Sequence, residues 1–274
     1  MNNNPLKQYF RRPGVYLKLP SGGRGYPAGA LNIPETGELA VYPMTAIDEI
    51  TTKTPDALFN GTAVAELIKS CIPDIIDPWA VTSEDLDSVL IAIKAASGGN
   101  DFEVTSVCPK CANEGTYGVN LVAVLSTMRA PDYSKPLEVS DLQIKFKALT
   151  YKEINQAGME QIEVQRIFAA IENAKDEQER IKLGEQALKG ITDLTMRLLT
   201  KAIEFIQTPN ATVTEKEYIL DFLKNCDKNM YVKIRDFNTE LKAQTEIKPL
   251  DIKCVECNNE YKQQFTLNPS DFFA

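Results

Sequence analysis

The spacing of apolar residues predicts helices in the carboxy-terminal half of the chain. Apolar side chains recur there every three or four positions, as they do on one face of a helix. The predicted helices cover residues 151–174, residues 177–207, a segment that begins after Thr214, and residues 228–245. Thr150 to Glu153 and Thr214 to Glu217 have the Thr-x-x-Glu pattern of a helix start. Four antiparallel helices form a bundle and return the chain to the side where it entered.

The preceding part of the chain mixes helical and alternating patterns. Thr54 before Pro55 is a good helix start, and the helix is expected to bend at Gly61 and to continue through residues 62–70. A second helix is predicted at residues 84–96, where Leu86, Val89, Leu90 and Ile93 form one stripe. Alternating apolar residues predict strands at residues 102–107, 137–149 and 247–252.

These patterns predict an α+β fold that is mostly helical. We expect a basic extended arm at residues 1–34 and an inserted antiparallel helical bundle at residues 150–245. Residues 35–149 together with 246–274 are expected to form a small α/β unit that carries a split, zinc-ribbon-like β platform.

The β platform is suggested by two Cys-x-x-Cys motifs in matching surroundings. When Cys108 is aligned with Cys254, Cys111 falls on Cys257, and an Asn-Glu pair follows each motif. A predicted strand precedes each motif and another follows it. Two such turns supply four thiolates for a tetrahedral metal site, which indicates one structural zinc ion per chain.

The spacing of the two motifs is unusual. Compact zinc sites separate their cysteine pairs by roughly 15–20 residues, whereas the whole predicted bundle lies between Cys111 and Cys254. A disulfide within each motif, or two free thiol pairs, are the alternative interpretations. The remaining cysteines, Cys71 and Cys226, lie at helical spacing from apolar residues and are expected to be buried as small hydrophobic side chains.

The amino-terminal arm differs in charge from the rest of the chain. Residues 1–34 carry five basic residues and no acidic one, although the whole chain has a formal net charge of −8. A basic segment with aromatic side chains can anchor on a partner subunit. The alternative is that the arm packs on the acidic body of its own chain. The candidate partner-binding residues are Tyr9, Phe10, Arg11, Arg12 and Tyr16.

Composition excludes several classes of function. The chain contains no histidine, which rules out Ser-His-Asp and Cys-His catalysis and histidine zinc sites. Four cysteine ligands leave no open position on a zinc ion, so the metal is expected to be structural and the chain not to be an enzyme. The negative net charge disfavours binding to nucleic acid.

The sequence indicates a reducing compartment. No apolar run approaches the roughly 20 residues of a membrane span, and residues 1–5 lack the features of a signal peptide. We therefore expect a cytosolic protein without membrane contacts, in which thiolates are favoured over disulfides. Whether the chain forms a homo-oligomer is left open by the sequence.

Three segments carry a resemblance to a known family. Residues 4–23 (Asn-Pro-Leu-Lys-Gln-Tyr-Phe-Arg-Arg-Pro-Gly-Val-Tyr-Leu-Lys-Leu-Pro-Ser-Gly-Gly), residues 38–50 and residues 54–61 resemble the baseplate hub assembly proteins of T-even and related contractile-tailed phages. The resemblance implies a non-enzymatic protein that acts when the central hub of the tail baseplate is built. Its implied partners are hub subunits, other tail proteins and the tape-measure protein.

The resemblance also implies a location and leaves one rival function. The protein is expected in the host cell cytoplasm during assembly, and the alternative of a place in the virion tail baseplate stays open. The rival function, based on the cysteine motifs alone, is that of a zinc-ribbon nucleic-acid-binding or transcription regulatory protein.

Overall fold

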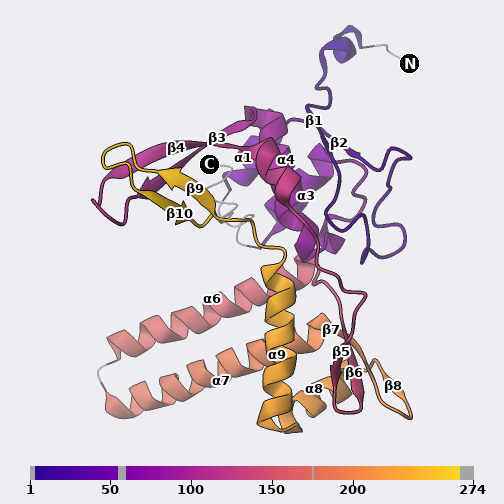
Figure 1. Ribbon diagram of the computed structural model, residues 1–274, viewed down its shortest axis with the longest axis vertical. Coiled ribbons are helices and arrows are strands. Elements are labelled where there is room, and N and C mark those ends of the chain that lie inside the picture. The colour runs from indigo at the N-terminus through magenta and orange to yellow at the C-terminus, as the bar shows by residue number, and fades with distance from the viewer. Residues whose placement is uncertain (1–3, 55–59, 175, 266–274) are drawn as a thin grey trace. The chain divides into compact units, whose positions relative to one another are not determined.

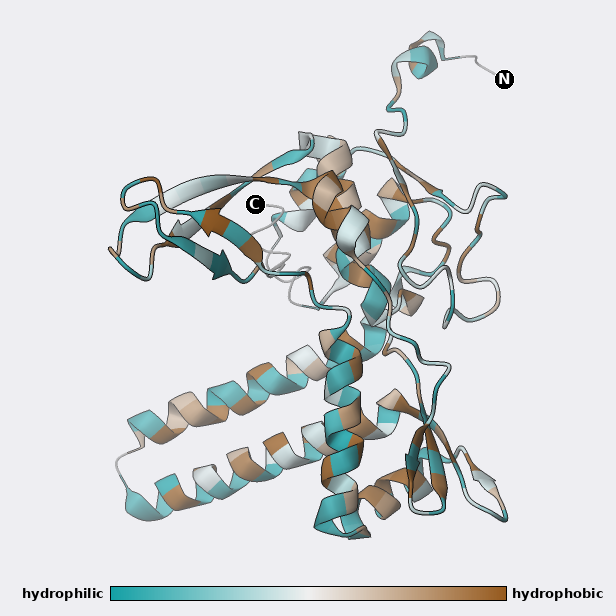
Figure 2. Ribbon diagram, in the orientation of Figure 1, coloured by the Kyte–Doolittle hydropathy of each residue, from teal (hydrophilic) through white to brown (hydrophobic). Residues whose placement is uncertain are grey.

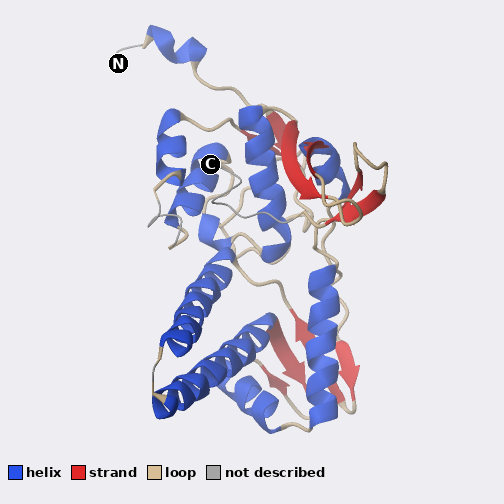
Figure 3. Ribbon diagram, turned by 90° about the vertical axis from the view of Figure 1, so that its left-hand side faces the viewer, coloured by secondary structure: helices blue, strands red, loops and turns tan. Residues whose placement is uncertain are grey.

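The computed structural model describes residues 4–54, 60–174 and 176–265. The chain divides into two compact units, of which unit 1 comprises Met1–Ala130 with Thr245–Ala274, and unit 2 comprises Pro131–Gln244. The helices and strands of both units are shown in Figures 1 and 3. The inserted unit therefore begins nearer the amino terminus than the predicted boundary at residue 150.

Unit 1 is an α+β unit. Its elements in chain order are η1 (Pro5–Tyr9), β1 (Val15–Leu17), β2 (Leu39–Val41), α1 (Ala46–Thr52), α3 (Thr62–Cys71), η2 (Pro78–Ala80), α4 (Ser83–Gly98), β3 (Asp101–Val107), β4 (Glu114–Asn120), α5 (Leu121–Thr127), β9 (Leu250–Lys253) and β10 (Glu260–Gln263).

The core of unit 1 lies around α3 and α4. Both predicted helices are confirmed, although residues 55–59, where we expected the first of them to begin, lie outside the described residues. Apolar side chains of α3, α4 and the β1–β2 pair become fully or almost fully buried because their stripes face one another. They include Leu17, Leu39, Val41, Val64, Leu67, Ile68, Leu90, Ile91 and Ile93.

Most of the predicted extended arm is packed against unit 1. β1 pairs antiparallel with β2, and Leu17 and Leu19 are buried. Residues 4–10, in contrast, are exposed throughout, and Figure 1 shows η1 standing away from the rest of unit 1. Beyond residue 10 the segment thus packs on its own chain, which is the alternative that the sequence left open.

A buried carboxylate, Asp85 of α4, anchors the loop that follows β1. Its oxygens accept hydrogen bonds from the Ser21 N–H (2.9 Å), the Ser21 hydroxyl, the Tyr26 hydroxyl (3.1 Å) and the Thr82 hydroxyl (3.2 Å). Burial raises the pKa of Asp85, and the hydrogen bonds from Ser21 oppose that shift. Four donors offset the cost of burying one carboxylate.

A second carboxylate, Asp48 of α1, helps to hold the base of the exposed segment. The Arg11 guanidinium lies 3.5 Å from it and donates 2.7 Å hydrogen bonds to the Pro43 and Ser70 carbonyl oxygens. Asp48 also completes the capping box of α1 with Thr45. Arg11 is thus engaged within unit 1.

Unit 2 is built from helices and a sheet. Its elements are β5 (Leu137–Val139), β6 (Leu142–Phe146), α6 (Tyr151–Asn173), α7 (Glu177–Ala202), β7 (Ile203–Gln207), β8 (Thr212–Val213), α8 (Lys216–Asn225) and α9 (Lys228–Ala243). The strands form one antiparallel sheet in the order β5-β6-β7-β8.

The sheet corrects the prediction of a purely helical bundle. The helix predicted at residues 177–207 ends at Ala202, and Ile203–Gln207 continues as β7, which pairs with β6. Ile203 and Ile206 are both buried although they lie three positions apart, and the pairing register shifts between Lys145 and Phe146 as at a β-bulge. The strand predicted at residues 137–149 consequently belongs to unit 2.

The two predicted capping boxes differ in outcome. Thr150 and Glu153 form a capping box at the start of α6, as predicted. At α8 the residue before the helix is Glu215, without a side-chain capping bond, so the predicted box from Thr214 to Glu217 is wrong.

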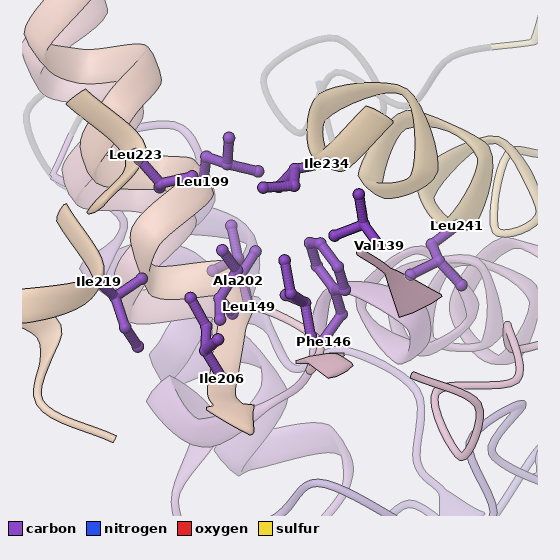
Figure 4. Close-up of a cluster of buried hydrophobic side chains, with 12 residues drawn as sticks. Val139, Phe146, Leu149, Leu199, Ala202, Ile206, Ile219, Leu223, Ile234 and Leu241 are labelled. Atoms are coloured by element: carbon purple, nitrogen blue, oxygen red, sulfur yellow. The ribbon is translucent and has the colours of Figure 1, made fainter. Parts of the chain in front are cut away.

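Unit 2 has a hydrophobic core of its own. Twelve buried residues from its sheet, the loop after β6, the end of α7, α8 and α9 meet there, among them Phe146, Ile219 and Ile234 (Figure 4). Unit 2 therefore buries its own apolar surface, as an independent domain does.

Replacing Asp85 by alanine is expected to destabilise unit 1. The buried donors of Ser21 and the half-buried hydroxyl of Tyr26 would lose their acceptor, which lowers the free energy of unfolding by about 3 kcal/mol. The single tryptophan, Trp79, lies in unit 1, so its fluorescence during urea unfolding measures the effect. Glu66→Ala, at an exposed position of α3, is the control, and an equal stability of the two variants would contradict the assigned role.

A neighbouring carboxylate, Glu84, is buried without this compensation. The residue is 5% exposed, and its Oε2 atom has no hydrogen-bond partner among the described residues. Burial, and next the negative charge of Asp85, raise the pKa of Glu84 to about 7, although Arg24 opposes the shift. The folded state therefore favours the protonated form of Glu84.

This raised pKa predicts how stability depends on pH. In the unfolded chain a glutamate titrates near its usual pKa of about 4.3. The contribution of protonated Glu84 to the free energy of unfolding is therefore fully present below that pH, and it is lost as pH rises through about 7. The stability advantage of Glu84→Gln over the wild type should therefore grow by about 2 kcal/mol between pH 5 and pH 8. Urea unfolding at both pH values measures this difference, which Glu66→Gln should not reproduce.

Candidate metal centre

The four cysteines of the two Cys-x-x-Cys motifs come together in unit 1. Cys108 and Cys111 lie in the turn of the β3–β4 hairpin, and Cys254 and Cys257 lie in the turn of the β9–β10 hairpin. Their sulfur atoms all lie within 4.8 Å of one another. Across the hairpins, the Sγ atoms of Cys108 and Cys257 are 3.6 Å apart, and those of Cys111 and Cys254 are 3.7 Å apart.

The two turns have the same backbone geometry. In the first, the Cys108 N–H donates to the Asn113 carbonyl at 2.9 Å, and in the second the Cys254 N–H donates to the Asn259 carbonyl at 2.9 Å. Ala112 and Asn258 occupy equivalent positions with φ of 55° and 56°, in the left-handed region. The sequence alignment of the motifs therefore corresponds to a structural repeat.

Backbone N–H groups favour the thiolate form of the first cysteine in each turn. Burial opposes the shift at Cys108, but hydrogen bonds from the Cys111 and Lys110 N–H groups lower its pKa to about 6. The Cys257 N–H likewise lowers the pKa of Cys254. Sulfur accepts hydrogen bonds as a thiolate, so both turns are preorganised for anionic ligands.

The second cysteine of each turn is more accessible. Cys111 is exposed and Cys257 is half-buried, whereas Cys108 and Cys254 are buried. The Asn113 N–H lowers the pKa of Cys111, but hydrogen bonding with the other sulfurs, Cys257 first, raises it to about 12. Without a cation, four clustered sulfurs cannot all ionise, since like charges at this distance repel.

Contacts between the hairpins hold the two turns in place. The buried Ser106 hydroxyl donates to Gln263 Oε1 at 2.8 Å and accepts from the Tyr261 hydroxyl at 3.0 Å. Phe102 and Phe265 meet edge to face, with ring centroids 6.2 Å apart. Strands β3 and β10 are thereby joined by polar and aromatic contacts.

The geometry fits a metal ion with four sulfur ligands. Such a donor set is typical of closed structural sites, with no position left for a substrate. Among the described residues this is the only group of three or more cysteine or acidic side chains that could hold a metal ion. Lys253, next to Cys254 in the chain, lies 3.6 Å from Glu260.

The other two cysteines lie elsewhere. Cys71 is fully buried in α3, as predicted, and burial raises its pKa to about 12. Cys226 is only half-buried, at the end of α8. Neither belongs to the sulfur cluster.

The candidate partner-binding residues divide into two groups. Tyr9, Phe10 and Tyr16 are 77%, 58% and 64% exposed, and Arg12 is exposed as well. Arg11, in contrast, is bound to α1 and α3 within unit 1. Its contacts hold the base of the exposed segment.

The sequence interpretation missed the two anchoring carboxylates. The Thr45-x-x-Asp48 capping box is visible in the sequence and could have located Asp48. The partners of Asp85 are different, because Ser21 lies 64 positions away and no local pattern connects the two residues.

Comparison with known proteins identifies the family. The family model described as T4 bacteriophage base plate protein matches residues 15–274. No curated protein and no solved structure matches the chain. Within the described residues, none of the helices has the length and apolar character needed to cross a bilayer. With this match over nearly its whole length, the chain belongs to the family of T4 bacteriophage base plate proteins.

Proposed function

We propose that this protein acts in the assembly of the baseplate hub of a contractile phage tail and contains one structural zinc ion. The observation that carries the proposal is the family match over residues 15–274, which implies a structural role in the virion tail. The assignment to the hub rests on the resemblance of residues 4–23, 38–50 and 54–61 to hub assembly proteins. Hub subunits and the tape-measure protein are the proposed partners.

The sulfur cluster supports zinc as the bound ion. A zinc–sulfur distance of about 2.3 Å in a tetrahedral site places the sulfurs about 3.8 Å apart, close to the 3.6 Å and 3.7 Å across the hairpins. When bound, zinc would supply a fixed positive charge and no redox chemistry. Cys108, Cys111, Cys254 and Cys257 would hold it and so link two hairpins that are separated by all of unit 2 in the chain.

The exposed amino-terminal segment supports partner contacts. Leu6, Tyr9 and Phe10 are each more than half exposed, and Lys7 adds a positive charge. Exposed aromatic side chains on a short, tethered segment can insert into pockets of a partner. Assembly in the host cytoplasm would precede incorporation in the tail.

The zinc proposal predicts the metal content of the purified protein. Mass spectrometry of the metals should find one zinc ion per chain in the wild type and in Cys226→Ser. Cys108→Ser and Cys254→Ser should lose the ion and unfold the two hairpins, because metal binding contributes to their folding. A wild-type protein without zinc, or with iron in its place, would refute the proposal.

The arm proposal predicts a loss of binding without a loss of stability. A chain lacking residues 1–10 should bind the hub subunits of the same phage at least tenfold more weakly, since aromatic anchors are removed. Its urea unfolding should equal that of the wild type, because residues 4–10 are exposed. Removal of residues 1–34 is a poorer test, since it would also delete β1 and the partners of Asp85.

The matched control changes exposed apolar residues at another place. Ile47 and Ile50 of α1 are 75% and 68% exposed, and replacing both by alanine should leave binding intact. The double variant Tyr9→Ala with Phe10→Ala should reproduce the deletion. If hub subunits bind the deleted chain as tightly as the wild type, the segment is not the contact site.

A further inference from the structure

The two cysteine turns have matching backbones but different side-chain surroundings. In Figures 1 and 2 both turns lie at the ends of their hairpins, where hydrophobic residues appear in brown. Two backbone N–H groups of the first turn donate to the sulfur of Cys108, and the two equivalent groups of the second turn donate to that of Cys254. The backbone alone therefore treats Cys108 and Cys254 alike.

One asparagine side chain breaks this equivalence. Asn259, which follows the second turn, donates from Nδ2 to the sulfur of Cys108 in the first turn at 3.9 Å. Its equivalent after the first turn is Asn113, since each of the two carbonyls accepts the N–H of the first cysteine in its own turn. Within the described part of the chain, the side-chain hydrogen bonds to sulfur include none from Asn113. Cys108 thus has a side-chain donor that Cys254 lacks.

The bond from Asn259 crosses between the two hairpins. Donor and acceptor lie 151 positions apart in the chain, and Asn259 is half-buried, so water competes only in part for its N–H. Four thiolates outweigh the charge of one divalent ion, and N–H groups that face the sulfurs offset the remaining negative charge. Asn259 therefore stabilises Cys108 as a ligand and links it to the second turn.

Solvent access divides the four sulfurs in another way. Cys108 and Cys254 are 1% and 0% exposed. Cys257 is half-buried, and Cys111 alone of the four is exposed. A chelator, or an incoming ion, can reach Cys111 without a change in the two turns, because neighbouring atoms shield the buried sulfurs.

We propose that the metal site is asymmetric: Asn259 positions Cys108 as the most firmly held ligand, and the ion enters and leaves the site at Cys111. This inference rests on the proposed zinc ion and adds residues that control its affinity and exchange. Asn259 contacts a ligand sulfur and not the ion, so it is a positioning residue.

Matched substitutions at the two asparagines test the role of Asn259. Asn259→Asp and Asn113→Asp add the same charge beside the cluster and keep the backbone carbonyl, but only the first replaces a donor to sulfur. Titration of the full chain with Co²⁺, followed by displacement with Zn²⁺, should give an affinity at least tenfold weaker for Asn259→Asp than for Asn113→Asp. Asn259→Ala and Asn113→Ala repeat the comparison without added charge.

The spectrum of the cobalt form separates positioning from a general loss of structure. The sulfur-to-cobalt charge-transfer band should move to lower energy in Asn259→Ala and stay in place in Asn113→Ala, because a thiolate without a hydrogen bond gives up charge more readily. A wild type that binds neither Co²⁺ nor Zn²⁺ would refute the zinc proposal as a whole. Metal binding with equal affinities and equal band energies in the paired variants would overturn the role of Asn259 alone.

Alkylation tests the route of metal exchange. In the zinc-loaded Cys226→Ser protein, iodoacetamide should modify Cys111 at least tenfold faster than the other three ligands, since it is the accessible sulfur. Mass spectrometry of the digested protein measures each rate, and zinc release should follow the modification of Cys111. Faster modification of Cys108, Cys254 or Cys257 would overturn the proposed route.

Discussion

The arrangement of unit 1 depends on bringing the two cysteine turns together. Four sulfur atoms within 4.8 Å of one another must come from hairpins that unit 2 separates in the chain. The sulfurs can meet only if unit 2 returns to its start. Within unit 2 the first strand and the last helix share one core, where Val139 and Leu241 are both buried. Without an ion the four thiolates would repel one another. An ion that binds them would add its binding free energy to the free energy of folding.

Two buried carboxylates determine how much of the amino-terminal segment remains free. Asp85 holds the loop around Ser21 and Tyr26 on α4, and Asp48 helps to hold Arg11 against α1 and α3. Both carboxylates are compensated by several donors, as buried charges require. Glu84, next to Asp85, is not, and its raised pKa is the consequence. The free segment is therefore short and is fixed at its base.

The partner-binding residues proposed for this base plate family member are not those of its sulfur cluster. A closed four-sulfur site offers structure and no reacting position. Exposed apolar groups occur at several places among the described residues, and three of them, Leu6, Tyr9 and Phe10, gather on the short segment before Arg11. A short segment with exposed aromatic side chains suits a protein that contacts other tail proteins.

By itself the sequence determined much of the local structure and which cysteines come together. The matched Cys-x-x-Cys motifs identified the four sulfurs, and helical spacing located α3, α4, α6 and α9, because these signals depend on neighbouring residues. Tertiary structure decided the rest. Ile203–Gln207 continues the apolar pattern of α7, and only pairing with β6 makes it a strand. The arm residues looked free since their partners, Asp85 and Asp48, are far away in sequence. Which apolar stripe of α7 is covered depends on the position of α6, and a periodic pattern carries no information about its partner.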